Sequence, residues 1–281
     1  MPTVMDSPEN LKSALLEIEK WEKDQKDLWF WEKLGRLPFM LLDKITPKFI
    51  QEKLGLAVDE IGSYIQNGGK YLISERSVID KLHQNAAQND GLLGANHEET
   101  TINDVADMPL SILNLTAEQL ASSRSKMATL QGATTGIGGI FTLAIDIPAI
   151  LGLSLKIIQE IAICYGFDPK SKEERVFAVK VMQFASSDIV GKKAILDELG
   201  AYEEVNRSNQ MLSQLQGWSE VVAVYRDNFG WKKLFQMIPV AGMLFGAFIN
   251  RGMLNDVAEA ATMLYRKRRV LIKLGENEAK A

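Results

Sequence analysis

Apolar and polar positions along the chain do not alternate in the way that β-strands require. No run of alternating Val, Ile and Thr is bounded by Asn-Gly or Asp-Gly turns. Helix signals are frequent instead, because capping residues and first-turn prolines mark starts, and glycine with proline marks ends. The sequence therefore predicts an all-α protein, a multi-helix bundle. The expected helices cover residues 8–34, 47–67, 74–88, 117–138, 140–165, 171–186, 191–215, 218–227 and 240–274.

Four local patterns predict where helices begin. Two place a capping side chain before a first-turn proline, and two fit the capping box, in which each side chain bonds a free amide of the first turn. They are Ser7-Pro8, Thr46-Pro47, Thr116 with Gln119, and Ser171 with Glu174.

Two apolar segments stand out in the second half of the chain. Gly136–Leu155 is long enough to cross a bilayer, but Asp146 lies near its middle and Pro148 interrupts it. A central aspartate costs about 3 kcal/mol in a bilayer. Met237–Ile249 is too short to cross. We therefore interpret the first segment as a helix buried in a protein core, with membrane insertion as the alternative.

The polar stretch Gln84–Thr101 is the best candidate for a linker, because it contains glycines and few apolar residues. It separates an N-terminal helical part from a longer part that holds both apolar segments. We expect a Trp-rich helical extension over residues 1–44, a helical domain over residues 45–275 that contains this linker, and a tail over residues 276–281.

Composition excludes several classes of protein. The 281 residues are 46% hydrophobic and 24% charged, which is typical of globular chains, and a net charge of −4 argues against a general nucleic-acid binder. Cys164 is the single cysteine, so no intramolecular disulfide can form. With only His83 and His97 beside it, no metal site is expected. The N-terminus resembles no secretory signal, so we expect the cytoplasmic side.

The glycine-rich stretch Gly132–Gly139 matches the G-x-x-x-G-x-G pattern of short-chain dehydrogenases. Such a loop binds a pyrophosphate only between a strand and a helix. Here the preceding residues, Glu118–Leu130, are typical of a helix. The sequence also holds neither a following Tyr-x-x-x-Lys nor a Gly-Lys-Ser/Thr motif. We therefore predict no nucleotide and no other cofactor.

Close packing of two helices explains these glycines better. Gly132, Gly136 and Gly139 continue one helical face, and Gly242 and Gly246 repeat the spacing in the second apolar segment. Each glycine costs about 1 kcal/mol in a helix interior relative to alanine, which indicates a packing role, although a hinge would serve as well. We predict that the two glycine faces pack on each other, in the core or at a membrane.

Asp146 needs a partner, because an unpaired buried carboxylate is costly. If the two glycine faces pack in parallel, Arg251 lies near Asp146. If they pack antiparallel, Lys232 or Lys233 lies near Asp146 instead. We favour a structural ion pair or a cap before Pro148. The alternative is a polar site in the helical bundle.

Two further features indicate contact with a membrane surface or a partner helix. Residues 28–42 concentrate aromatic side chains that cannot all face one core: Trp29, Phe30, Trp31 and Phe39. The C-terminal helix carries a basic cluster that suits anionic headgroups at about 1 kcal/mol per charge: Arg266, Lys267, Arg268 and Arg269. The alternatives are burial of the aromatics between two layers, and favourable placement of the basic residues near a helix C-terminus.

A set of short motifs resembles the EcsC protein family across about residues 45–275. This largely bacterial family is named after a gene beside an ABC transporter, and no catalytic residues are assigned in it. The resemblance implies an α-helical, membrane-associated protein and transfers no active site. The motifs are Gln131–Gly136, Asp146-Ile147-Pro148, Tyr165–Pro169, Glu174-Arg175 with Phe177, Ile238–Gly242 and Gly246–Asn250.

These observations favour a non-catalytic helical protein. We expect it to associate with the cytoplasmic membrane face or a membrane-protein partner through the aromatic stretch, the apolar segments and the basic cluster. One alternative is a soluble enzyme or small-ligand binder whose pocket is lined by the glycine-rich helices and Asp146, and another is a bundle in which the apolar segments are only core. The sequence contains no nucleophile elbow and no HExxH, so no catalytic residue is predicted.

Overall fold

The computed structural model describes residues 6–26, 62–68, 73–90, 100–135, 140–187, 192–197, 199 and 253–280, and side chains within 124–150 are not described. These residues form α-helices and contain no strand, so the all-α prediction is confirmed for this part of the chain. The helices with described bounds are α1 (Pro8–Lys26), α5 (Glu75–Asp90), α6 (Ile102–Ala106), α7 (Leu110–Thr135), α8 (Ile140–Cys164), α9 (Lys172–Ser186) and α13 (Met253–Lys280). Residues 62–67 and 192–197 are helical as well.

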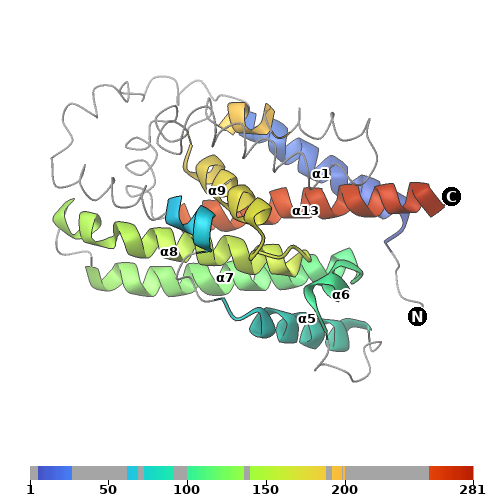
Figure 1. The fold of residues 1–281 in the computed structure, drawn as a ribbon, viewed down its shortest axis with the longest axis horizontal. Helices are drawn as coiled ribbons and strands as arrows, with labels where there is room; N and C mark the ends of the chain where they lie inside the picture. Colours follow the sequence, from blue (N-terminus) through green and yellow to red (C-terminus); the bar gives the residue numbers. More distant parts are fainter. Residues whose placement is uncertain are drawn as a thin grey trace.

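Helix α13 is the element on which the others assemble. It packs against α1, α7, α8 and α9, although it is the last helix of the chain (Figure 1). Helix α5 lies against both α7 and α8, and the short α6 contacts α5 and α8. The first and last helices of the described part are therefore direct neighbours.

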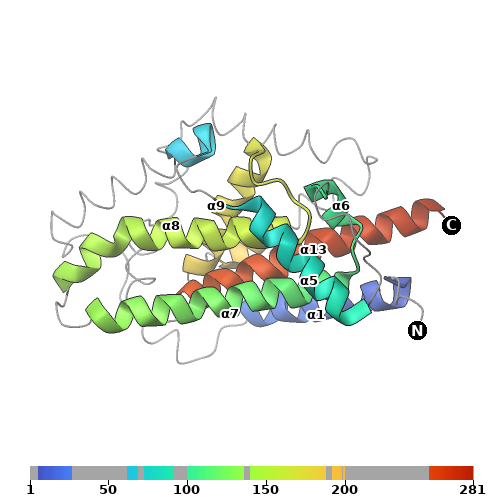
Figure 2. The ribbon, with the colours of Figure 1, turned by 90° about the horizontal axis from the view of Figure 1, so that it is seen from below.

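Helices α7 and α8 form a long hairpin. They lie side by side in both views, and their connected ends extend past the first residues of α13 (Figures 1 and 2). The described buried side chains of α7 lie on its first half, at residues such as Ile112 and Leu120. Those of α8 lie on its second half, from Leu151 onward. The described half of the hairpin thus packs in the core, and the sequence of the connected end is apolar, with Asp146 as its sole formal charge between residues 127 and 150.

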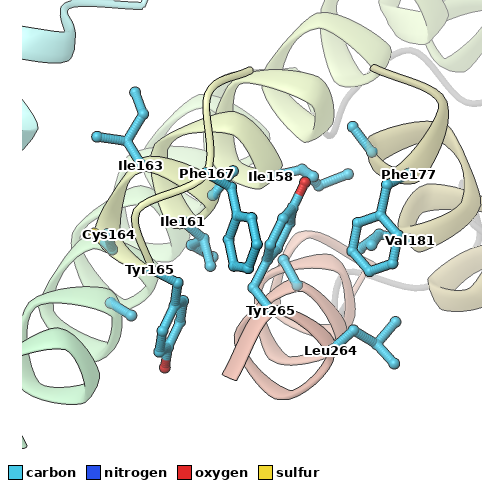
Figure 3. Packing of buried hydrophobic residues seen from close by; sticks show 14 of the residues in the cluster. Ile158, Ile161, Ile163, Cys164, Tyr165, Phe167, Phe177, Val181, Leu264 and Tyr265 are labelled. Carbon is cyan, nitrogen blue, oxygen red and sulfur yellow. The ribbon is translucent and has the colours of Figure 1, made fainter. Parts of the chain in front are cut away.

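An aromatic cluster closes the core where α8, α9 and α13 meet. The Tyr265 ring lies between those of Phe167 and Phe177, with ring centroids 5.4 and 4.9 Å away (Figure 3). Ile158 and Ile161 of α8 belong to the same cluster and are fully buried. Tilted and edge-on aromatic pairs contribute about 0.5–1.5 kcal/mol beyond their buried area.

The turn after α8 fixes the direction of the chain into α9. Gly166 has a φ of +72°, and its N–H bonds the Ile163 carbonyl at 2.9 Å, while the Phe167 N–H bonds the Ala162 carbonyl at 3.0 Å. This is a Schellman ending, in which a left-handed glycine satisfies the last carbonyls of a helix. Gly166 also lies directly against the backbone of Ala106 in α6.

Two of the predicted helix starts are confirmed. Ser7 Oγ accepts a hydrogen bond from the Asn10 N–H at 3.2 Å, and α1 begins at Pro8. Ser171 Oγ accepts from the Glu174 N–H at 3.1 Å, and α9 begins one residue later. The prediction at Thr46-Pro47 lies outside the described residues.

The predicted start at Thr116 is wrong. Helix α7 begins at Leu110, and the Thr116 hydroxyl donates to the Ile112 carbonyl at 2.9 Å within the same helix. Asp6 accepts a hydrogen bond from the Leu110 N–H at 2.9 Å and caps the helix. Helix α5 also continues through Asp90, so the first seven residues of the predicted linker are helical.

None of the described helices is both long enough and apolar enough to cross a bilayer.

Candidate functional site

Most of the residues that the sequence singled out have no described side chain. Gly132 and Asp146 lie on the backbones of α7 and α8. The other glycines, the aromatic residues and the suggested partners of Asp146 are outside the described residues: Gly136, Gly139, Gly242, Gly246, Trp29, Phe30, Trp31, Phe39, Arg251, Lys232 and Lys233. The packing of the two glycine faces and the partner of Asp146 therefore stay predictions.

The basic cluster of α13 is described, and its first two members face α1. Arg266 Nη2 lies 2.8 Å from Glu17 Oε2, and Lys267 Nζ lies 3.0 Å from Glu22 Oε1. Both side chains of the second pair are largely buried, with 13% and 15% of their surface exposed, whereas Glu17 is 62% exposed. Charged groups paired away from water interact more strongly than exposed ones.

The other two members hold the α8–α9 turn. Arg268 forms a two-pronged ion pair with Glu174, and its guanidinium carbon lies 4.1 Å from the centre of the Phe167 ring. Arg269 Nε donates to the Tyr165 carbonyl at 2.8 Å and its Nη2 to the Gly166 carbonyl at 3.1 Å. Burial lowers the pKa of Arg269. Each of the four basic side chains therefore has a partner within the fold.

A polar cluster of three side chains joins α5 to α7. The buried Asn85 Nδ2 donates to Thr116 Oγ1 at 2.8 Å and to Gln119 Oε1 at 3.2 Å. Gln119 Nε2 returns a bond to Asn85 Oδ1 at 3.2 Å. The sequence pattern Thr116-x-x-Gln119 predicts a helix cap. Its actual role is to satisfy a buried amide from another helix.

A groove of about 520 Å³ lies between α7 and α13. Its lining is mostly apolar and includes a carboxylate from each helix: Glu118, Ala121 and Ser122 from α7, and Asn255, Ala258, Glu259, Thr262 and Met263 from α13. The Trp21 indole N–H donates to Glu259 Oε1 at 2.6 Å and so orients that carboxylate. Sequence reasoning missed the groove, because its two walls are far apart in the chain.

The described residues offer little for nucleophilic or metal chemistry. Burial raises the pKa of the Cys164 thiol, and a protonated thiol is a poor nucleophile. Within the described ranges, no three His, Cys, Asp or Glu side chains gather as metal ligands. The polar groups found here position helices against one another.

The chain belongs to the EcsC protein family, whose model matches residues 12–270 and so extends from α1 to α13. Two relatives come from Bacillus subtilis (strain 168). The uncharacterized protein YdbA is 53% identical over 278 residues, which is 99% of this chain and 98% of the relative. Protein EcsC is 31% identical over 173 residues, which is 62% of this chain and 70% of the relative. No solved structure matches the chain significantly.

Proposed function

We propose that the protein is a non-catalytic helical protein that associates with the cytoplasmic face of the membrane through the connected end of the α7–α8 hairpin. The observation that carries the proposal is the apolar sequence of the connected end of this hairpin, together with its position in the fold (Figure 1). One half supplies buried side chains to the core under α13. The other half extends past the start of α13 (Figure 1), and Asp146 is the sole formal charge of Met127–Ile150.

An apolar contact fits this chain better than headgroup attraction. The basic cluster that would attract anionic lipid is engaged with Glu17, Glu22, Glu174 and backbone carbonyls in the fold. Charges paired in this way add little attraction to a distant surface, particularly at physiological salt. Apolar burial, in contrast, is insensitive to screening. The aromatic stretch over residues 28–42 is the second contact that we propose.

Flotation of the purified protein with liposomes tests the hairpin contact. The double variant Phe141→Gln with Leu143→Gln places two amides in the apolar end, and burying an unbonded amide costs about 1–3 kcal/mol. We expect this variant to leave the lipid fraction. The matched control is Leu16→Gln, because Leu16 is a large apolar side chain on α1 with 66% of its surface exposed. It should float like the wild type.

Thermal unfolding separates loss of contact from loss of fold. We expect both variants to keep the helical circular dichroism of the wild type. If both variants float equally well, the hairpin end makes no membrane contact and the proposal fails at that surface.

A further inference from the structure

We infer that the groove between α7 and α13 docks a basic amphipathic helix, the kind of segment that a membrane-protein partner presents at the cytoplasmic surface. The inference rests on the proposed function for the location of the partner. It concerns a different surface from the hairpin end, and its chemistry can be tested without lipid.

The floor of the groove suits apolar side chains and aliphatic stems. Small side chains from both helices line it, Ala121 and Ser122 from α7 and Ala258 and Thr262 from α13, and Met263 lines it as well. A methionine side chain adapts its shape to the group that packs on it. The volume of about 520 Å³ lies within the range of about 300–1,000 Å³ that is usual for binding sites. The groove therefore has room for more than one side chain of a docked helix.

The negative charge of the groove walls favours a positively charged occupant. Glu118 on α7 and Glu259 on α13 are both exposed and both line the groove. The hydrogen bond from Trp21 holds the Glu259 carboxylate in place. A Lys or Arg side chain can lay its stem along the apolar floor and direct its charged end to these carboxylates. An anionic lipid headgroup would be repelled at the same position.

The groove lies close to the proposed membrane contact on α7, where a membrane-protein partner would be within reach. Ser122, in the groove, is five residues before Met127, where the apolar half of the hairpin begins. At 1.5 Å per residue the two are about 8 Å apart along the helix axis. A protein attached through the hairpin end would hold the groove close to the membrane surface. Cytoplasmic segments beside membrane spans are rich in Lys and Arg, so a membrane protein offers the required chemistry there.

A labelled model peptide tests the inference in solution. The probe is a peptide of about 18 leucine and lysine residues patterned to give one apolar helix face. The comparison probe has glutamate in place of each lysine. Fluorescence anisotropy should show saturable binding of the lysine peptide to the full-length protein, and weak or no binding of the glutamate peptide. Equal binding of the two peptides, or no binding of either, would overturn the inference.

Three variants test whether the peptide occupies the groove. Glu118→Lys reverses a wall charge and Ser122→Trp fills the floor, so each should weaken binding about tenfold or more. The matched control is Glu278→Lys, which makes the same charge change at an exposed position near the end of α13. It should leave binding within about twofold, since exposed charges that far apart are screened. If all three variants bind like the wild type, the peptide binds elsewhere and the inference is wrong.

The same variants separate this inference from the proposed function. Glu118→Lys and Ser122→Trp should float with liposomes as the wild type does, because neither changes the hairpin end. Loss of peptide binding with normal flotation supports both proposals. Peptide binding without flotation of any form supports the groove and refutes the membrane contact.

Discussion

Gly166 lies where α6, α8 and α9 meet, and its conformation determines how they pack. Its φ of +72° lies in the left-handed region, and an added Cβ would lie 2.9 Å from both Cα and N of Ala106. The substitution Gly166→Ala therefore combines backbone strain with a clash against backbone atoms that cannot rotate away. We expect it to lower the free energy of unfolding by about 2–4 kcal/mol in urea denaturation.

Gly275 provides the control for that prediction. It lies within α13, and nothing stands within 4 Å of an added Cβ. The change Gly275→Ala should raise stability by up to about 1 kcal/mol, since alanine favours the helix. Equal effects of the two alanine substitutions would contradict the packing of α6 against the α8–α9 turn.

The stability that Asp104 contributes at the start of α6 depends on pH. Its carboxylate accepts a hydrogen bond from the Thr101 N–H at 2.7 Å, and this bond to the backbone is the main cause that lowers its pKa below 3.8. A lowered pKa means that the carboxylate stabilises the fold above pH 3.8, and that this contribution disappears as the pH falls through the lowered value. Amide chemical shifts of Thr101 should follow that titration, and Asp104→Asn should abolish it.

At the scale of elements, the contact of α1 with α13 combines two unlike ion pairs. The Lys267–Glu22 pair is largely buried, whereas Glu17 in the Arg266–Glu17 pair is mostly exposed. A double-mutant cycle with alanine should give a coupling of about 1–3 kcal/mol for the first pair and below about 1 kcal/mol for the second. Raising the salt concentration should reduce the second coupling more. The reverse order would show that α1 packs differently on α13.

The sequence was informative about helices and much less so about their partners. Ser7 and Ser171 could be recognised as caps, because a cap acts on amides three residues away. Thr116 has the same local pattern, yet it lies inside α7 and bonds Asn85 of another helix. The two situations cannot be distinguished locally, since only the tertiary partner differs between them.

Tertiary partners also could not be predicted for the basic cluster and for the groove. The partners of Arg266 and Arg268 are Glu17 and Glu174, 249 and 94 residues away along the chain. A sequence pattern identifies four adjacent cations on a helix, but it does not contain the contacts that pair them. The groove is likewise formed by two helices that meet only in the folded chain.

For the whole molecule, the family match from residue 12 to residue 270 covers most of α1 and of α13, the first and last helices of the described fold, which pack on each other. The described side chains of the α7–α8 hairpin pack in this core, and the sequence of the connected end is apolar. The proposed function assigns the connected end to membrane contact, while the described half of the hairpin stabilises the fold.

Flotation of the wild-type protein with liposomes of neutral and of anionic lipid, at about 0.1 and about 1 M salt, tests this account most directly. Apolar contact predicts flotation with both lipids at both salt concentrations, because the Debye length falls from about 10 to about 3 Å without weakening apolar burial. Flotation only with anionic lipid at low salt would assign the contact to the basic cluster instead. Absence from the lipid fraction under all four conditions would contradict the membrane contact itself.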